Sequence, residues 1–415
     1  MRIGVDGQAL VGGIPTGFGV YAKLLERALS ELQAEGRLSY HIFKPGSQDK
    51  PLRTVADRLF WERFQLPRLI RGEDAMRTLD IFHSPCLRAP FPIRMPLVVT
   101  IHDLITITHP PKGIAARYYF CGILPAGWKR AKLILCDSST VKNEVVEYLQ
   151  IPHDRVRVIY LYSRFERKRR SAVCEEESEQ YLDIKGEAFD GGKRGQGVNA
   201  GEGAVFSLLL VGSLERRKNF QLAVQALSKL PKTVRDRCAL NIAGLGEKGA
   251  EELLMHARRL GLEERIKLLG YLSEKELFKT YKKAFLLIAP SKEEGFNLPP
   301  LEAMSLGVPV LLSDIPVHRE VYSVREKAHG ERVDSSEGSA KDEKYPGFFN
   351  PDSPQELAEL IARTIEDESF YEKLKDFGRR IASALSMERF KRELLSAYES
   401  IALTQRDRTA SPSDG

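Results

Sequence analysis

Two glutamates beside an expected helix start are the residues whose types and spacing best support chemistry. Glu294 lies in a glycine-containing loop after an apolar stretch, and Glu302 follows it further along the chain. Pro299 and Pro300 suit the first positions of a helix, so Glu302 falls in its first turn. The unpaired N–H groups of a helix N-terminus form a good diphosphate site, and both carboxylates can face a ligand there. Either glutamate could instead be a surface charge or complement the helix dipole.

A basic run, Arg216–Lys218, follows a second apolar stretch and Gly212. Cations fixed at the end of a strand can neutralise a phosphate, because preorganised positive charge stabilises charge that develops in a reaction. The same run could equally be a solvated face. The residues alone leave both interpretations open.

A histidine follows a third apolar stretch. His102 comes directly after Leu97–Ile101 and begins a loop with Asp103. A lone histidine is more often a core or surface group than a catalytic one. The glycine-rich segment Gly12–Gly19 could cradle phosphate through its backbone N–H groups or be an ordinary turn. It lacks the GxGxxG spacing of a dinucleotide fingerprint, which disfavours NAD binding.

Strands and helices alternate along two long parts of the chain, and these elements must position the side chains above. In the first part we expect strands at Arg2–Asp6, Ile81–His83, Leu97–Ile101 and Leu133–Cys136, with helices at Val20–Gln33 and Ser139–Tyr148. In the second part we expect strands at Phe206–Val211, Ala239–Ala243, Ile266–Leu269, Phe285–Ala289 and Pro309–Leu312, with helices at Asn219–Leu230, Glu247–Leu260, Glu274–Ala284, Pro300–Leu306, Pro354–Glu366 and Phe370–Leu385. This pattern predicts an α/β protein with two doubly wound domains, each a mostly parallel sheet covered on both faces. Such sheets bind ligands at the carboxyl ends of their strands.

The alternation also sets the expected domain limits. We expect an N-terminal domain over 1–163, a linker with a flexible insertion over 164–204 and a C-terminal domain over 205–386. The linker is rich in glycine and charge and has little to bury. A polar insertion is expected over 325–345, a final helix over 387–403 and a disordered tail over 404–415.

The segment Ser291–Met304 resembles the signature of family 4 of the retaining glycosyltransferases: seven residues separate two glutamates, Gly-Phe stands between them and Leu-Glu-Ala-Met ends the motif. The resemblance extends over about residues 1–160 and 205–400 through Val211–Asn219, Ala243–Gly246, Leu269–Leu272, Gly307–Val310, Thr100–Leu104 and Gly17–Gly19. It implies the GT-B fold, in which two Rossmann-like domains face each other across a cleft and the final helix crosses back to the N-terminal domain. Ser213 departs from the pattern, because some members carry an arginine directly after the loop glycine.

The resemblance implies catalytic roles for His102, Glu294 and Lys218. Glu294 would hold hydroxyls of the donor sugar, and Lys218 with Arg217 would neutralise the diphosphate leaving group. His102 would position the sugar or the acceptor without acting as a general base, because the departing phosphate would take the acceptor proton. The chain has no Asp-x-Asp motif at a strand end, and the family generally needs no bound metal. We therefore expect neither a metal nor a cofactor.

The resemblance also implies substrate contacts. Glu302 would hold the ribose hydroxyls of the nucleotide, and Tyr271 and Leu272 would border the base. Further donor contacts would come from the loop residues Gly212, Gly295, Phe296, Asn297 and Leu298. On the acceptor side the resemblance points to Gly17, Phe18, Gly19 and Asp103.

The charge and composition of the chain limit the classes of partner that it is expected to bind. The chain has a net charge of +6, and residues 1–165 hold 23 Lys and Arg against 15 Asp and Glu, so all the excess basicity lies in the first part. The mixed apolar and basic segments 59–71 and 118–132 could contact an anionic membrane surface or simply pack on a core. The basic excess lacks the aromatic-interleaved patch of a nucleic-acid binder. The five cysteines form no CxxC pair, which predicts reduced thiols, and no apolar leader or spanning run is present.

The function expected from these observations is transfer of a hexose from a nucleotide diphosphate sugar to a saccharide acceptor. The acceptor is expected to be lipid-linked, in cell-envelope or exopolysaccharide assembly, by a cytoplasmic protein that can associate peripherally with the plasma membrane. Two alternatives stay open at this point. The first is a soluble transferase with a small acceptor, and the second is a non-catalytic nucleotide-sugar-binding protein on the same scaffold.

Overall fold

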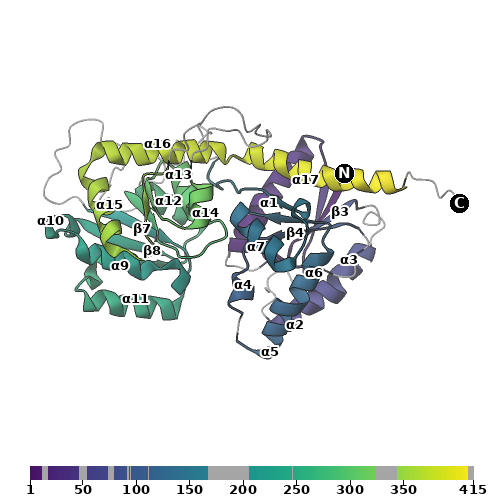
Figure 1. Ribbon diagram of the computed structural model, residues 1–415, viewed down its shortest axis with the longest axis horizontal. Coiled ribbons are helices and arrows are strands. Elements are labelled where there is room, and N and C mark those ends of the chain that lie inside the picture. The colour runs from purple at the N-terminus through teal and green to yellow at the C-terminus, as the bar shows by residue number, and fades with distance from the viewer. Residues whose placement is uncertain are drawn as a thin grey trace. The chain divides into compact units, whose positions relative to one another are not determined.

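The computed structural model of the chain describes residues 1–11, 17–45, 54–72, 79–90, 93, 95–110, 112–166, 205–244, 246–323 and 344–409. The chain divides into two compact units: unit 1 comprises Met1–Leu161 with Met387–Gly415, and unit 2 comprises Tyr162–Ser386. Each unit is built around one six-stranded parallel sheet with helices packed on it (Figure 1). The predicted α/β class is confirmed, with one doubly wound sheet in each unit.

The sheet of unit 1 has the strand order β2-β1-β3-β4-β5-β6. Its strands are β1 (Arg2–Asp6), β2 (Ser39–Phe43), β3 (Ile81–Ser84), β4 (Leu97–Ile101), β5 (Leu133–Cys136) and β6 (Val156–Val158). The central strands β3, β4 and β5 are buried along their whole length, as expected for a parallel sheet covered on both faces.

Helices and turns of unit 1 cover both faces of this sheet. They are η1 (Gln8–Leu10), α1 (Gly17–Ala34), α2 (Val55–Phe60), the π-helical turn η2 (Trp61–Gln65), α3 (Leu66–Gly72), α4 (Ile105–Thr108), α5 (Ile114–Tyr118), the π-helical turn η4 (Tyr119–Ile123), α6 (Leu124–Arg130), α7 (Ser139–Leu149) and α17 (Met387–Thr409). Side chains of β3 alternate between the faces. His83 meets Tyr398 of α17, with Nδ1 2.6 Å from the hydroxyl oxygen, whereas Phe82 joins the core that contains Trp61 and Trp128.

The sheet of unit 2 has the strand order β12-β11-β10-β7-β8-β9. Its strands are β7 (Phe206–Val211), β8 (Cys238–Ala243), β9 (Ile266–Gly270), β10 (Leu286–Ala289), β11 (Val310–Ser313) and β12 (Phe348–Phe349). Its helices are α9 (Phe220–Lys229), α10 (Lys232–Arg235), α11 (Glu247–Arg259), α12 (Glu274–Lys283), α13 (Leu298–Ser305), α14 (Pro316–Val321), α15 (Pro354–Glu366) and α16 (Glu368–Ala384). A one-turn helix, η7 (Arg216–Lys218), follows β7.

Four expectations about segment limits differ from the structure. The first unit ends at Leu161 rather than 163, because Ser163 lies with unit 2, its Oγ 2.7 Å from that of Ser305. The expected linker start is wrong as well, since Phe165 is buried against Tyr281 of α12. The final helix continues to Thr409, so 404–409 are helical and not disordered. Helix α1 begins at Gly17 rather than Val20. The rest of the expected linker and most of the expected insertion lie outside the described residues.

Candidate active site

The loop that follows β7 brings Gly212 and Lys218 together. Gly212 has a φ of 149°, and a Cβ at this position would lie 3.4 Å from Cε of Lys218. The neighbouring loop after β8 approaches so closely that a Cβ at Gly244 would lie 1.7 Å from the carbonyl oxygen of Gly212. Only glycine fits at position 244, which explains the first glycine of the predicted Ala243–Gly246 segment.

Lys218 and Arg217 converge on Glu294, which comes from the loop after β10. Lys218 Nζ lies 2.5 Å from Glu294 Oε1, and Arg217 Nη1 lies 2.9 Å from Glu294 Oε2. The hydroxyl of Ser291 donates a third hydrogen bond, at 2.7 Å. The Glu294 side chain is only 6% exposed. Burial alone would raise the pKa of Glu294, but Lys218 and Arg217 outweigh it and hold the pKa below its usual range, so the carboxylate stays ionised.

These three residues come from segments about 76 positions apart, and the structure places them in one cluster. Arg217 also bonds Glu215, with Nε 2.7 Å from Oε2. An incoming diphosphate must therefore compete with two carboxylates for the cations of this cluster. The arrangement can hold a phosphate ligand only if the cations turn from glutamate to phosphate.

The loop Gly295–Leu298 is fixed by α14, which the sequence prediction missed. Asn297 has the left-handed φ of 69° and precedes the first residue of α13. Its side-chain amide donates to Nε2 of His318, at 2.9 Å, and its carbonyl accepts a hydrogen bond from the hydroxyl of Tyr322. His318 Nδ1 donates to the carbonyl of Ser313, at 2.8 Å. Burial lowers the pKa of His318 to about 4, so the ring is neutral and can accept from Asn297.

Glu302 lies in α13 but not in its first turn, because the helix already begins at Leu298 and the first turn holds no acidic residue; the predicted first-turn position is wrong. Its carboxylate is already bound by two side chains. Arg164 Nε and Nη2 lie 2.6 Å and 3.2 Å from its two oxygens, and the Tyr281 hydroxyl donates at 2.9 Å. Glu302 is 0% exposed. A ligand can reach this carboxylate only after Arg164 gives up one of its two contacts.

The remaining predicted donor residues lie at the carboxyl ends of unit 2 strands. Tyr271 and Leu272 follow β9, and the Tyr271 side chain is exposed. Phe296 is buried, with its ring 6.3 Å from that of Tyr322, and Gly295 is also buried. Their positions agree with the rule that open parallel sheets present ligand sites at this edge.

In unit 1, His102 forms a buried ion pair with Asp137 at the ends of β4 and β5. Its Nδ1 lies 2.6 Å from Asp137 Oδ2, and its Nε2 lies 2.8 Å from the carbonyl oxygen of Pro85. Both partners are acceptors, so both ring nitrogens donate and the ring is an imidazolium. Burial lowers the pKa of His102, but the carboxylate of Asp137 outweighs it and raises the pKa well above its ordinary value. A ring in this state is a fixed positive charge and not a general base.

Of the other predicted acceptor-side residues, one contacts His102 and another only shapes a helix start. The ring of Phe18 packs at a tilt against that of His102, with centroids 5.3 Å apart. Phe18 belongs to the first turn of α1, between Gly17 and Gly19. Asp103 accepts the backbone N–H of Ile105, at 3.0 Å, and so shapes the start of α4. Residues 12–16 of the glycine-rich loop lie outside the described residues.

Two family profiles match the two units in the order in which they occur. The profile described as Glycosyltransferase Family 4 matches residues 19–161, and the profile described as Glycosyl transferases group 1 matches residues 202–381. The chain belongs to glycosyltransferase family 4. The segment Ser291–Met304 falls within the second profile, in unit 2, and the predicted family is confirmed.

Solved structures confirm the GT-B fold of this glycosyltransferase. The structure of HepE from Anabaena in complex with UDP and glucose matches with a TM-score of 0.61 at 17% identity, over 96% of this chain and 99% of that chain. Sucrose-phosphate synthase from Thermosynechococcus elongatus matches with a TM-score of 0.64 at 17% identity, over 97% and 100% of the two chains.

Curated relatives of the glycosyltransferase include enzymes of Escherichia coli. O-antigen chain mannosyltransferase B is 28% identical over 84% of this chain and 81% of its own length. The serotype-specific mannosyltransferase WbdA is 28% identical over 76% of this chain and 36% of its own length. The chain thus spans about a third of the length of the first relatives it matches. Within the part of the chain that the structure describes, no helix has the length and apolar character required to span a bilayer.

The sequence interpretation missed four residues that hold predicted site residues: Asp137 in unit 1, and Arg164, Tyr281 and His318 in unit 2. Asp137 follows β5 in the same way that His102 follows β4, and this parallel placement is a signal that sequence reasoning can use. Arg164 and Tyr281 lie 138 and 21 positions from Glu302, with no local pattern that links them to it.

Proposed function

We propose that this glycosyltransferase is a retaining hexosyltransferase that uses a nucleotide diphosphate sugar and extends a saccharide, in O-antigen or related cell-surface polysaccharide assembly. The observation that carries the proposal is the convergence of Lys218 and Arg217 on Glu294 beside the N-terminus of α13. The names of the mannosyltransferase relatives and the UDP and glucose bound by HepE support it.

The chemistry follows from charge. When the sugar–phosphate bond breaks, negative charge develops on the diphosphate, and Lys218 and Arg217 stabilise it if they turn from Glu294 to the phosphates. The N-terminus of α13 adds the positive end of a helix dipole. Glu294, released from its cations, accepts hydrogen bonds from hydroxyls of the donor sugar. Glu302 accepts the ribose hydroxyls once the nucleotide displaces one contact of Arg164.

The acceptor side is assigned to unit 1. The imidazolium of His102 donates to two acceptors and keeps its charge, so it positions a polar group rather than removing a proton. In a retaining reaction of this kind, the departing phosphate takes the proton of the acceptor hydroxyl on the same face of the sugar. No resident metal is required for this sequence of steps.

A turnover assay tests the proposal. The protein is incubated with GDP-mannose, UDP-glucose, UDP-galactose and ADP-glucose, and release of the nucleoside diphosphate is measured with and without a mannoside acceptor. Release that depends on the acceptor supports the proposal, and the anomeric coupling in the NMR spectrum of the product then tests retention. Binding of a nucleotide sugar without any release contradicts it and favours the non-catalytic alternative.

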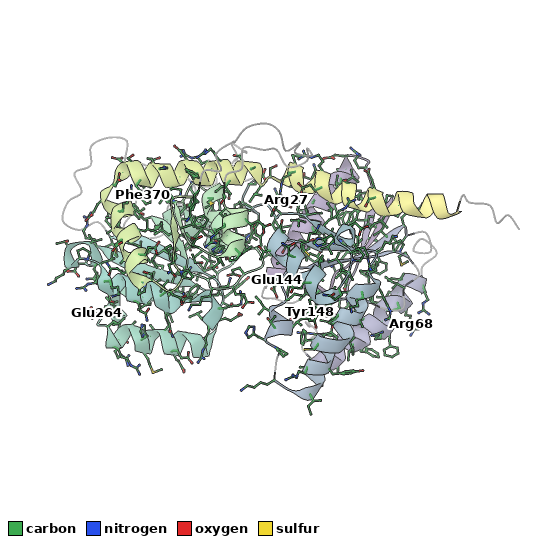
Figure 2. The ribbon with its side chains drawn as sticks, viewed as in Figure 1. Arg27, Arg68, Glu144, Tyr148, Glu264 and Phe370 are labelled. Carbon is green, nitrogen blue, oxygen red and sulfur yellow. The ribbon has the colours of Figure 1, made fainter. Side chains whose placement is uncertain are left out.

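A peripheral membrane location is part of the same proposal, because a lipid-linked acceptor requires it. Aromatic and aliphatic side chains of α2, η2, α3 and α5 face solvent: Phe64 is 65% exposed and Ile114 is 91% exposed. Tyr119 donates to Glu62, so η4 and η2 are neighbours. Arg68 of α3 adds exposed positive charge in the same part of unit 1 (Figure 2). Exposed apolar groups with flanking cations suit an anionic bilayer surface.

Sedimentation with phosphatidylglycerol vesicles tests this location. We expect the wild-type chain to pellet with these vesicles at low salt, and Phe64→Ser with Ile114→Ser to reduce the pelleted fraction while nucleotide binding is kept. Equal sedimentation of the double variant and the wild type would contradict a role for this surface.

A further inference from the structure

Unit 1 contains a second buried polar cluster besides the His102–Asp137 pair, and the proposed reaction assigns no role to its residues. We call it the Asp6 cluster; its members are Asp6, Gln8, Glu62, Ser84 and Arg88. Asp6 ends β1 and Ser84 ends β3. The two strands are parallel with Val5 paired to His83, so the next step of this register places Asp6 beside Ser84 on one face of the sheet.

Two π-helical turns hold the acidic groups of the Asp6 cluster. From η2, Trp61 Nε1 donates to Asp6 Oδ1, at 3.1 Å, and Glu62 follows it directly. From η4, the hydroxyl of Tyr119 donates to Glu62 Oε1, at 2.7 Å, and Arg88 Nη1 lies 3.5 Å from the same oxygen. Single π-helical turns occur often at functional sites, and here two of them point their polar side chains at one place.

The Asp6 cluster contains polar groups whose hydrogen bonds are not satisfied. Within the part of the chain that the structure describes, three buried side-chain atoms of the cluster have no hydrogen-bond partner. They are Nε2 and Oε1 of Gln8 and the hydroxyl oxygen of Ser84. Gln8 is 7% exposed and Ser84 is 0% exposed. Buried polar groups almost always have partners, because an unmet hydrogen bond destabilises the fold. A bound ligand with hydroxyl groups would supply the missing partners.

The Asp6 cluster adjoins the acceptor-side residues. His102 Nε2 lies 2.8 Å from the carbonyl oxygen of Pro85, the residue that directly follows Ser84. The Cys86 thiol faces the carbonyl of Phe18, at 3.8 Å. The cluster is thus continuous with His102 within unit 1.

The charges of the Asp6 cluster select the ligand. The carboxylates of Asp6 and Glu62 face the guanidinium of Arg88, and the guanidinium of Arg58 also interacts with Glu62. Two positive groups thus balance two negative ones, so the cluster has no excess positive charge to hold a phosphate. An amide, a hydroxyl, a guanidinium and carboxylates together offer both donors and acceptors at close spacing. Neighbouring hydroxyls of a sugar ring need this combination, since each hydroxyl both donates and accepts.

We propose that the Asp6 cluster binds ring hydroxyls of the acceptor saccharide, with Gln8 and Ser84 as the groups that determine specificity. This inference rests on the proposed glycosyltransferase function. The donor site lies in unit 2, so donor binding and acceptor binding can be measured separately.

The two tryptophans of the chain provide the test, because both Trp61 and Trp128 are in unit 1 and only Trp61 contacts Asp6. The protein is labelled with 5-fluorotryptophan, and ¹⁹F NMR is recorded during titration with methyl α-D-mannopyranoside. We expect a saturable shift of the Trp61 resonance that is larger than that of Trp128, because Trp61 contacts Asp6 directly whereas Trp128 donates to the carbonyl of Leu87, outside the cluster. In Gln8→Met the apparent affinity should fall by roughly five- to tenfold for the lost hydrogen bonds.

A stability measurement separates binding from structure. Replacing the unpaired Gln8 amide by an apolar side chain of similar size should leave the melting temperature unchanged or raise it. A purely structural Gln8 would instead lower it. Gln221→Met, the same change at an exposed site of α9, should alter neither quantity. An unshifted Trp61 resonance, or a shift caused by inorganic phosphate and not by the glycoside, would overturn the proposal. The affinity for UDP and GDP, measured by calorimetry, should be the same in Gln8→Met and the wild type. If neither protein binds a nucleoside diphosphate, the proposed function fails, and this outcome is distinguished from failure of the acceptor proposal.

Discussion

Replacing Arg164 by methionine should destabilise unit 2 through the buried carboxylate of Glu302. Glu302 is completely buried, and Arg164 supplies two of its three hydrogen bonds. Leaving a buried charge without its partner costs about 3–5 kcal/mol. The Tyr281 hydroxyl still donates in the variant, so we expect the lower end, about 3 kcal/mol.

The size of the shift follows from the size of unit 2, about 225 residues. For a domain of this size each kcal/mol moves the melting temperature by roughly 2–4 °C, so Arg164→Met should lower it by roughly 6–12 °C. Differential scanning calorimetry at pH 7.5 measures this shift. Arg258→Met is the matched control, because Arg258 and its partner Glu263 are both well exposed and such pairs add little.

A second substitution tests the cause. If the loss comes from an unpaired charge, then Arg164→Met combined with Glu302→Leu should recover much of the stability, because an apolar pair replaces the ionic one. The reasoning is refuted if Arg164→Met costs less than about 1 kcal/mol, or if the double variant is no more stable than the single one. Nucleotide affinity should survive in Arg164→Met, since the Glu302 carboxylate no longer has to leave Arg164.

Three further predictions concern protonation and metal. Asp137→Asn should leave His102 neutral near pH 7, visible in ¹⁵N NMR of the ring, and lower kcat/KM about tenfold for the lost ionic hydrogen bond; a ring that stays protonated would contradict the ion pair. The pKa of His318 is about 4 when folded and about 6.5 when unfolded, so stability present above pH 6.5 should fall by up to about 3 kcal/mol as the pH drops to 4. Denaturant unfolding should detect this loss in the wild type and a smaller one in His318→Gln; equal losses would argue against it. Turnover should survive EDTA, and loss of activity that magnesium or manganese restores would contradict catalysis by fixed charge alone.

The sequence predicted the buried strands of both sheets and missed three strands at their edges. Strands β2 and β6 end the sheet of unit 1, and β12 ends the sheet of unit 2. β2 alternates exposed and partly buried residues, and β12 has two residues. Edge strands of this kind lack the continuous apolar run that reveals a buried parallel strand.

Some residues of the candidate site were likewise predicted from the sequence, and others were missed. Lys218, Arg217 and Glu294 were predicted because their motifs resemble those of glycosyltransferase family 4. The structure brings the three side chains together. Arg164 was placed in a linker because its neighbours are charged, yet it binds a carboxylate far along the chain. Contacts of this range depend on tertiary packing and leave no periodic trace in the sequence.

The central claim is that the cluster of Lys218, Arg217 and Glu294 binds the diphosphate of a nucleotide sugar. Isothermal titration of UDP and GDP into the wild type, Lys218→Met and Lys292→Met measures this most directly. Lys292 lies in the same loop as Glu294 but is exposed and paired with Asp352, so its loss should leave affinity unchanged. Lys218→Met should weaken the preferred nucleotide roughly ten- to hundredfold, the cost of one ionic hydrogen bond. Equal affinity of Lys218→Met and the wild type, or no binding of any nucleoside diphosphate, would contradict the claim.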